Sequence, residues 1–405
     1  MTLRVLVWAP AGADGVLIKP TGPPPVQPWR VLCYVEPLAA MGIELRGLPL
    51  VVDEPALYSD GLDAVKAAAD WADAILFRPI ETDWACRQCD FRTPWEALAR
   101  NHAARTGHEP SPEDMLLRRF WNDLGPRRAQ VGVIFDTDHW IEPDAMWWVP
   151  APMRDQVAGW RHPITTADLV TVSTPRLARH CERFNPNVRV IRNSIDVAQY
   201  VPTEPRRKGR ARLVWYAAGG VTDRLSDWTG PARAAAREHH DRLRSVFVGA
   251  NPNRPEDGAT LRSASWDEVR PAVDFRVWPR ALANSWPDIG ISPLRPSPYN
   301  ACRGENHWLE FAALGCPAVV EGWRGSGPNP YDAIRPGVDG LLARGRQEWS
   351  DQIGRLTRSP QLRADIGGAA RERVIREYDP RVRAAEMADA YRWAAEHAGI
   401  NRRGE

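Results

Sequence analysis

The chain has 405 residues, of which 43% are hydrophobic and 26% charged, as in an ordinary globular protein. This length exceeds the usual size of one hydrophobic core and favours two domains. The 53 basic and 51 acidic residues leave a net charge of +2, which provides no overall basic field for nucleic acid or a membrane surface.

Targeting signals are not evident in the sequence. No apolar run approaches the roughly 18 residues that cross a bilayer, and the short apolar N-terminus lacks a signal-peptide cleavage pattern. Two of the six cysteines, Cys86 and Cys89, have the spacing of metal ligands and not of a disulfide framework. We therefore expect a cytoplasmic protein without a membrane span.

Short apolar strands alternate with helical segments along the first half of the chain. The expected strands are residues 3–10, 42–50, 73–79, 129–138, 167–174 and 188–196. The expected helices are residues 29–42, 61–72 and 176–184. This alternation is typical of a parallel sheet with helices on both faces, so we expect an α/β domain over residues 1–200.

The pattern restarts after a proline-rich, basic linker, "VPTEPRRKGRA". Further strands are expected at residues 212–220, 245–252, 273–279, 288–294, 317–323 and 339–343. A long amphipathic helical region then runs from about Ser359 to the C-terminus. We expect a second doubly wound domain over residues 201–385, a cleft between the domains, and a C-terminal helix, residues 386–405, that packs back on the first domain.

Residues 82–119 interrupt the alternation and contain a predicted zinc site. Within "CRQCDFRTPWEALARNHAARTGH", the spacing C-x2-C-x12-H-x5-H is formed by Cys86, Cys89, His102 and His108. Zn²⁺ prefers four tetrahedral thiolate and imidazole ligands, which a knuckle and a helix supply at this spacing. The segment resembles a C2H2 zinc finger and predicts a structural Zn²⁺. The alternative is an unmetallated hairpin with coincidental histidines.

The role of this zinc-finger-like insertion stays open between three interpretations. Its arginines make it locally basic, which would suit contact with DNA phosphates. A single finger offers a small footprint, however. We therefore favour a clip that orders a loop beside the cleft, or a surface that docks the acceptor.

A cluster of polar residues in the second domain predicts a ligand site. In "RGENHWLEFAALGCPAVVEGW", Arg303, His307 and Glu310 have i, i+4, i+7 spacing, which places them on one face of a helix that ends at Gly315. Open α/β sheets bind ligands at the carboxyl ends of their strands, and the N-terminus of a helix favours a phosphate. The alternative is a surface helix with solvated charges.

The surrounding sequence resembles a known family. "DIGISPLRPSPYNACRGENHWLEFAALGCPAVVEG" and "YDAIRPGVDGLLA" are similar to the nucleotide-sugar site of retaining GT-B glycosyltransferases, which carry an E-x7-E motif. "ADLVTVSTPRLA" and "VRVIRNSIDVAQY" in the first half resemble the same enzymes. The resemblance implies two Rossmann-like domains facing a cleft, a UDP- or GDP-sugar donor in the second domain, and an acceptor in the first. It also implies transfer of a hexose to a hydroxyl with retention.

The resemblance also implies roles for individual residues at the donor site. Glu310 would accept hydrogen bonds from the ribose hydroxyls, while Arg303 and Arg224 would neutralise the diphosphate and stabilise the leaving group. Asn300 and His307 would line the sugar or the diphosphate. The first glutamate of the family motif falls at Cys302 and is therefore missing.

Candidate acceptor residues follow two strands of the first domain. Gly12 and Gly15 in "PAGADG" would let the backbone approach a ligand closely, although a plain turn explains them equally well. Asp138 and His139, in "FDTDHWIEPDAMWWVP", could orient an acceptor hydroxyl or remove its proton. The alternative for this loop is a capping and core role.

Three functions remain possible from the sequence. We favour a glycosyltransferase whose acceptor is a glycan, a protein or modified DNA. A nucleotide-sugar epimerase of the same fold would need carboxylates beside the sugar ring, and no motif in the sequence marks such carboxylates. A catalytically inactive nucleic-acid-binding protein would be consistent with the cysteine at position 302.

Overall fold

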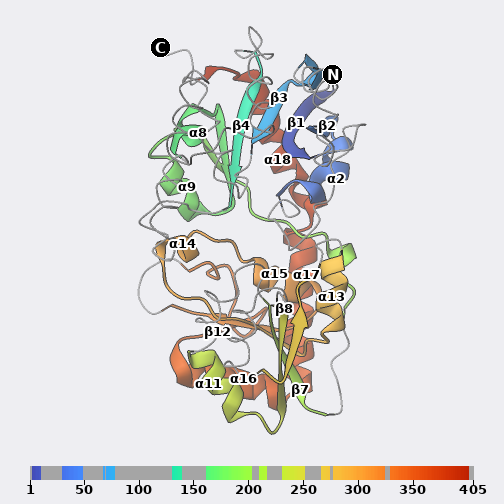
Figure 1. The fold of residues 1–405 in the computed structure, drawn as a ribbon, viewed down its shortest axis with the longest axis vertical. Coiled ribbons are helices and arrows are strands. Elements are labelled where there is room, and N and C mark those ends of the chain that lie inside the picture. Colours follow the sequence, from blue (N-terminus) through green and yellow to red (C-terminus); the bar gives the residue numbers. More distant parts are fainter. Residues whose placement is uncertain are drawn as a thin grey trace, which may run out of the picture. The chain divides into compact units, whose positions relative to one another are not determined.

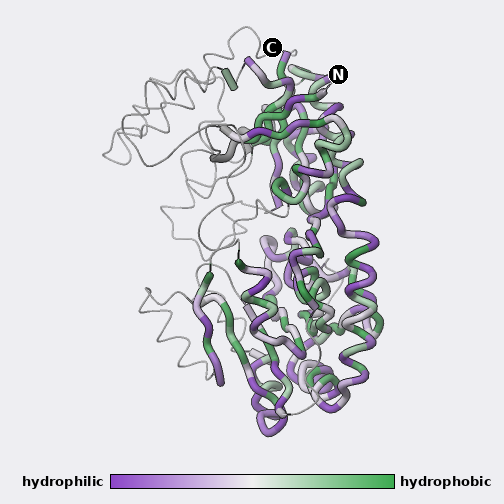
Figure 2. The backbone as a smooth tube through the Cα atoms, turned by 90° about the vertical axis from the view of Figure 1, so that its right-hand side faces the viewer, coloured by the Kyte–Doolittle hydropathy of each residue, from purple (hydrophilic) through white to green (hydrophobic). Residues whose placement is uncertain are grey.

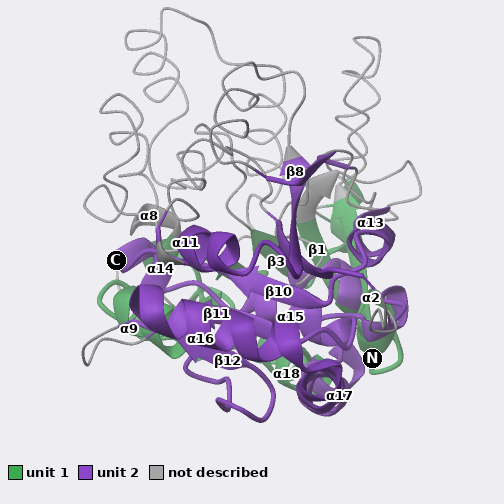
Figure 3. Cartoon of the chain, turned by 90° about the horizontal axis from the view of Figure 1, so that it is seen from below, with its two compact units in different colours: residues 1–18, 34–192, 384–405 green, residues 19–33, 193–383 purple. Residues whose placement is uncertain are grey.

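The computed structural model describes residues 2–10, 30–48, 67–68, 70–77, 130–138, 161–202, 209–216, 230–250, 266–273, 277–323 and 329–400. The chain divides into two compact units (Figure 3). Unit 1 comprises residues 1–18, 34–192 and 384–405, and unit 2 comprises residues 19–33 and 193–383. Asn193–Tyr200 therefore belong to unit 2, ahead of the domain boundary expected at residue 201. None of the described helices is both long and apolar enough to cross a membrane.

Unit 1 is built on a parallel six-stranded sheet with the order β2-β1-β3-β4-β5-β6 (Figure 1). Its strands are β1 (Leu3–Pro10), β2 (Ile43–Leu48), β3 (Ala74–Phe77), β4 (Gly132–Thr137), β5 (Leu169–Val172) and β6 (Val188–Val190). Its described helices include α2 (Val35–Ala39), α8 (Arg161–Thr166) and α9 (Pro175–Cys181). Every residue of β3, β4 and β5 is buried. Such continuous burial is typical of a parallel sheet covered on both faces.

The last helix, α18 (Pro380–Glu396), crosses from unit 2 into unit 1 at Ala384 and packs on the sheet of unit 1. It lies so close to the start of β4 that a Cβ atom on Gly132 would be 2.3 Å from the carbonyl oxygen of Ala394. Arg392 also donates a hydrogen bond to the carbonyl of Met41 at 2.8 Å. Glycine at position 132 is therefore required for this close approach.

Unit 2 contains a second parallel six-stranded sheet, with the order β12-β11-β10-β7-β8-β9. Its strands are β7 (Ala211–Tyr216), β8 (Leu243–Ala250), β9 (Glu268–Pro271), β10 (Ile289–Ser292), β11 (Ala318–Glu321) and β12 (Leu341–Ala343). The chain leaves β7 toward β8 and β9 and later returns to its other side with β10. The strand order therefore reverses between β7 and β10, and such reversal points bind ligands in open α/β sheets.

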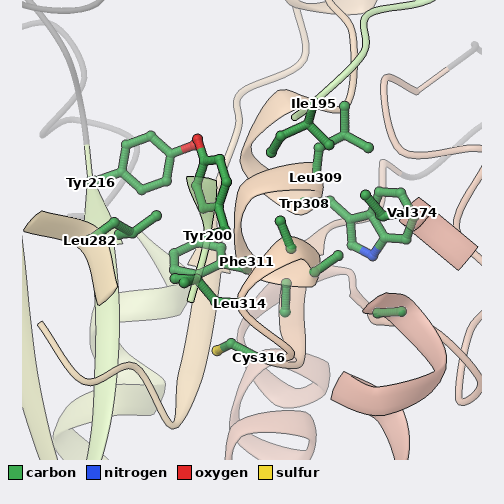
Figure 4. Packing of buried hydrophobic residues seen from close by; sticks show 14 of the residues in the cluster. Ile195, Tyr200, Tyr216, Leu282, Trp308, Leu309, Phe311, Leu314, Cys316 and Val374 are labelled. Carbon is green, nitrogen blue, oxygen red and sulfur yellow. The ribbon is translucent and has the colours of Figure 1, made fainter. Parts of the chain in front are cut away.

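Helices cover both faces of this sheet. They are η6 (Val197–Gln199), α11 (Pro231–Glu238), α13 (Trp278–Asn284), α14 (Pro298–Ala301), α15 (Asn306–Ala313), α16 (Gly345–Arg358) and α17 (Pro360–Glu377). Alternate residues of the strands enter two separate cores, because side chains point to opposite faces of a strand. Figure 4 shows part of the hydrophobic core around α15, which includes Tyr200, Tyr216 and Phe311. Figure 2 shows polar and apolar residues mixed along the long C-terminal helices.

Two expected elements of unit 2 are wrong. The strand expected at residues 273–279 lies earlier, at β9, and Trp278 instead begins α13. The alternating apolar residues suggested a strand, but Pro279 lacks an N–H and is well suited to the first turn of a helix. The helix expected from Arg303 begins three residues later, at Asn306, because α14 ends at Ala301 and Arg303–Glu305 are not helical.

The helix expected at residues 29–42 is much shorter in the structure. It consists of the single turn η1 (Leu32–Tyr34) followed by α2. Pro37 accounts for the late start of α2, since a proline is tolerated only in the first turn of an α-helix. Gly42 follows with a positive φ of 75°, as expected for the end of this segment. The zinc-finger-like insertion, residues 82–119, lies outside the described residues.

Candidate functional site

The carboxylate of Glu310 lies within the aromatic core of unit 2. Its side chain comes from α15 and is only 3% exposed. Its Oε1 atom accepts hydrogen bonds from the Trp278 indole Nε1 at 2.8 Å and from the Tyr200 hydroxyl at 3.2 Å. These donors come from α13 and from the residue that follows η6, so three separate segments meet at one carboxylate. Figure 4 shows Tyr200 and Tyr216 beside the α15 residues of this core.

The second oxygen of Glu310 is left without a partner. Oε2 is buried and has no hydrogen bond of normal geometry in the described part of the chain. Burial raises the pKa of Glu310 to about 7, although the nearby Tyr216 hydroxyl and the donors Trp278 and Tyr200 oppose the rise. A buried carboxylate that lacks partners for one oxygen is destabilising by itself. It is chemically suited to accept further hydrogen bonds from a ligand.

A second polar group lies at the reversal point of the sheet. Ser292, the last residue of β10, bonds through its Oγ to Nδ1 of His307 at 2.7 Å and to the hydroxyl of Tyr331. The His307 ring packs on Tyr216, the last residue of β7, with ring centroids 4.3 Å apart. His307 is partly exposed, whereas Ser292, Tyr216 and Tyr331 are buried. The carboxyl ends of β7 and β10 therefore hold one histidine between them.

The remaining predicted donor residues lie on the approach to α15. Arg303 is partly buried and does not share a helical face with His307 and Glu310, because it precedes the helix. Its positive charge still reaches this region, since it lowers the pKa of Tyr331 against the larger raising effect of burial. Asn300 lies in α14 and donates from Nδ2 to the carbonyl of Arg295 at 2.9 Å. Cys302, at the position of the missing glutamate, is fully buried.

An asparagine pair fixes the entry to α15. Asn193, which follows β6 in the sequence, donates from Nδ2 to Oδ1 of Asn306 at 2.7 Å. A Cβ atom on Gly304 would lie 2.9 Å from that same Asn193 nitrogen, so glycine is needed there. Glu305 is buried and accepts a hydrogen bond from the Tyr378 hydroxyl at 2.8 Å. The start of α15 is therefore held by groups far away in the sequence.

Sequence reasoning missed the aromatic residues and the hydroxyl that surround Glu310 and His307. These residues are Tyr200, Tyr216, Trp278, Ser292 and Tyr331. Two of them end strands, and the carboxyl ends of strands were already expected to hold a ligand. The aromatic residues gave no separate signal, because a buried aromatic in a strand or helix normally belongs to the core.

In unit 1, two acidic residues end the strand β4. Asp136 is buried and accepts a hydrogen bond from the Thr171 hydroxyl at 2.6 Å, which ties it to β5. Asp138 follows β4 directly and is 4% exposed. Of the other predicted residues, Gly12, Gly15, His139 and Arg224 lie outside the described residues. The described donor candidates, Asn300, Arg303, His307 and Glu310, all lie in α14, in α15 or between these two helices.

The predicted zinc ligands Cys86, Cys89, His102 and His108 also lie outside the described residues. Among the residues that the structure does describe, no group of histidine, cysteine and acidic side chains could hold a metal ion. The described cysteines are all free thiols.

Known proteins resemble this chain in part of its sequence and in its fold. The family model described as glycosyl transferase-like matches residues 263–389, which include β9 to β12, α15 and the candidate donor residues Asn300, Arg303, His307 and Glu310. A search of the curated proteins finds no match.

Solved structures match nearly the whole chain at low sequence identity. Sucrose-phosphate synthase from Thermosynechococcus elongatus is 14% identical with a TM-score of 0.60, and the match covers 96% of this chain and 98% of that one. HepE from Anabaena, solved with UDP-glucose, is 12% identical with a TM-score of 0.59 over 96% and 100% of the two chains. AviGT4, a glycosyltransferase involved in avilamycin A biosynthesis, is 15% identical with a TM-score of 0.56 over 98% and 99%. These likenesses show that the chain has the two-sheet α/β fold of GT-B glycosyltransferases.

Proposed function

We propose that this chain is a glycosyltransferase that binds a nucleotide sugar in unit 2 and transfers the sugar to an acceptor hydroxyl. The observation that carries the proposal is the buried carboxylate of Glu310, which has one oxygen satisfied and the other without a partner. The glycosyl transferase-like match covers this residue. The GT-B fold supports the same function.

Vicinal hydroxyls of a ribose fit this carboxylate. Each hydroxyl can donate one hydrogen bond, and a carboxylate can accept two such bonds in parallel. Trp278 and Tyr200 hold Oε1 in place, so Glu310 is oriented before the ligand arrives. A ligand that completes the bonding of Oε2 would offset part of the free energy lost by burying the group.

The diphosphate of the donor is assigned to the approach of α15. The first amides of a helix lack intrahelical acceptors, and the helix dipole favours an anion there. Arg303 lies three residues before α15 and supplies a positive charge that a guanidinium can share with two phosphate oxygens. Arg303, with Arg224, which follows β7 in the sequence, would stabilise the leaving diphosphate during transfer. Asn300 would line the same group.

The finer features of the reaction are inferred from the family resemblance. Transfer of a hexose with retention is expected, although Cys302 stands where the first glutamate of E-x7-E would be. The donor would be a UDP- or GDP-sugar. Asp138 and His139 in unit 1 are the candidates that would orient the acceptor hydroxyl or accept its proton. A structural Zn²⁺ at Cys86, Cys89, His102 and His108 remains a sequence-based prediction, and glycan, protein and modified DNA remain the acceptor classes to test.

The test is a calorimetric titration with UDP, GDP, ADP and their glucose conjugates. We expect one base to bind the wild type, and Glu310→Gln to weaken that binding at least tenfold, because the amide accepts only at one atom. Asp136→Asn is the matched control, since it changes an equally buried carboxylate in unit 1 and should leave nucleotide binding unchanged. Equal affinity of the wild type and Glu310→Gln would contradict the ribose assignment. No binding of any nucleotide, together with salt-sensitive binding to DNA, would favour the nucleic-acid-binding alternative.

A further inference from the structure

A short hydrogen-bond chain connects three side chains at the carboxyl ends of the strands in unit 2. It runs from the Tyr331 hydroxyl to Oγ of Ser292, and from that oxygen to Nδ1 of His307 at 2.7 Å. Tyr331 is 3% exposed and Ser292 is fully buried. The assignment of the ribose to Glu310 uses none of these three side chains, so their hydrogen bonds need a separate explanation.

The packing of α15 on β10 determines where His307 lies. Gly290 and Ser292 share one face of β10, and His307 and Phe311 are one turn apart on α15. The Phe311 ring covers Gly290 so closely that a Cβ atom there would lie 2.4 Å from it. This contact brings His307 over Ser292 in the same register. Tyr216 then packs against the rings of both His307 and Phe311, with centroids 4.3 and 5.6 Å away.

The donor and the acceptor in each of these hydrogen bonds follow from the partners available to the Tyr331 and Ser292 hydroxyls. Burial raises the pKa of Tyr331 to about 12, so its hydroxyl keeps its proton near neutral pH. In the part of the chain that the structure describes, Ser292 Oγ is the hydrogen-bond partner of this hydroxyl, and Tyr331 must therefore donate to it. Ser292 can then place its own proton only on Nδ1 of His307. Nδ1 is thus an acceptor, and the ring proton is held on Nε2.

We propose that His307 donates an Nε2–H hydrogen bond to a phosphate oxygen of the bound nucleotide, and that Ser292 and Tyr331 are positioning residues that hold this tautomer. The inference rests on the proposed function, because it deepens the role of the same donor site. A phosphate is the expected partner because His307 is the second residue of α15, where unpaired amides favour an anion. The positive charge of Arg303 acts on Tyr331 in the same region.

The tautomer can be measured without any ligand. We would label the histidine ring nitrogens with ¹⁵N, record long-range proton–nitrogen spectra, and identify His307 by its absence in His307→Gln. The wild type should show a single tautomer protonated on Nε2. Tyr331→Phe should produce a mixture, because Ser292 is then free to accept a proton from Nδ1, and Ser292→Ala should do the same. A wild-type ring protonated on Nδ1, or unchanged spectra in both variants, would overturn the inference.

Nucleotide affinity provides the second readout. With UDP and GDP as probes, Tyr331→Phe and Ser292→Ala should weaken binding about 3- to 10-fold, the usual worth of one hydrogen bond. His307→Ala should weaken it more, and His307→Gln should restore part of the loss, because a glutamine amide can place an N–H near the Nε2 position. Tyr391→Phe, which removes a hydroxyl from an equally buried tyrosine of unit 1, is the control.

The two proposals fail in different ways. If the wild type binds a nucleotide and the Tyr331, Ser292 and His307 variants bind it with the same affinity, the role of these three side chains is contradicted. The proposed donor site would then still be supported. A wild type that binds no nucleotide would contradict both the proposed function and the phosphate contact of His307. Unfolding midpoints of each variant would show whether a lost affinity reflects a lost fold.

Discussion

The indole nitrogen of Trp278 donates a 2.8 Å hydrogen bond to the carboxylate of Glu310, across 32 positions of the sequence. Both side chains are buried, with exposed fractions of 3% each. The same indole packs edge-on against Tyr216, with ring centroids 4.9 Å apart. Trp278 therefore both fills the core and favours the charged form of the carboxylate, which we infer binds the ribose.

The first prediction concerns this indole. Trp278→Phe keeps an aromatic ring but removes the donor, so the pKa of Glu310 should rise further above about 7. The folded chain should lose about 1–3 kcal/mol of stability, because a buried oxygen loses its partner. Trp349→Phe is a control in the other core of unit 2, where Nε1 makes a longer 3.3 Å contact with Glu321. Denaturant unfolding across pH would compare the two, and an unchanged Glu310 titration in Trp278→Phe would contradict the prediction.

The second prediction is a pH dependence of stability. The folded chain holds the Glu310 proton up to a pH of about 7, whereas the unfolded chain releases it near the model value of 4.5. The folded state therefore binds more protons between these values, and its stability falls as the pH rises through this window. The total loss is about 3 kcal/mol at the usual 1.4 kcal/mol for each pKa unit.

Glu310→Gln isolates this contribution. Since glutamine does not titrate, the variant should match the wild type near pH 4 and be more stable by about 3 kcal/mol at pH 8. Denaturant unfolding at several pH values would measure the difference. A difference that does not change with pH would show that Glu310 ionises normally.

The third prediction concerns nucleotide binding and protons. Ribose hydroxyls donate to a carboxylate more strongly in its charged form, so binding should release a proton from Glu310 below pH 7. Affinity should then fall by up to about tenfold for each pH unit below 7. Calorimetry in buffers of different ionisation enthalpy would detect the released proton. Proton uptake on binding would contradict the role given to Glu310.

Parts of the fold could be predicted from sequence because burial on both faces leaves a simple pattern. The strands β3, β5 and β10 are short apolar runs, and their buried residues agree with the expected segments. Gly315 was correctly expected to end α15, where its φ of 70° suits glycine. The strand expected at residues 273–279 was wrong, because alternating apolar residues precede a helix as readily as they form a strand.

The candidate site was only partly predictable. Glu310 was assigned to a ligand site by its spacing, and the family resemblance implied its role, but its burial was not expected because the spacing placed it on a polar helical face. The partners Tyr200 and Trp278 lie 110 and 32 positions away, and no local pattern reports such contacts. Arg303 was assigned to the helix because Gly304 and Glu305 do not interrupt a helical spacing by themselves. The packing of Asn193 against Gly304 and Asn306 decides that boundary instead.

The fourth prediction is the metal content of the chain. Purified protein should contain about one zinc ion per chain, bound by Cys86, Cys89, His102 and His108. Replacing both cysteines with serine should abolish zinc binding, because hydroxyls are poor zinc ligands. Nucleotide affinity should be unaffected, since the zinc is expected to be structural. Elemental analysis of the wild type and the double variant decides the question, and equal zinc content in both would exclude this site.

The fifth prediction uses two adjacent glycines in α17 as a matched pair. At Gly367 a Cβ atom would lie 2.0 Å from the carbonyl oxygen of Gly315, whereas at Gly368 no atom lies within 4 Å. Gly367→Ala should therefore destabilise unit 2 by about 1–3 kcal/mol, because the obstacle is backbone and cannot move aside. Gly368→Ala should stabilise it by about 0.5–1 kcal/mol, since alanine loses less backbone entropy in a helix. Gly315 lies two residues after the end of α15, so a shift of α17 at this contact should also disturb Glu310 and His307. Urea unfolding and nucleotide titration of both variants would show whether stability and affinity are lost together in Gly367→Ala. Equal free energies of unfolding for the two variants would contradict the close contact.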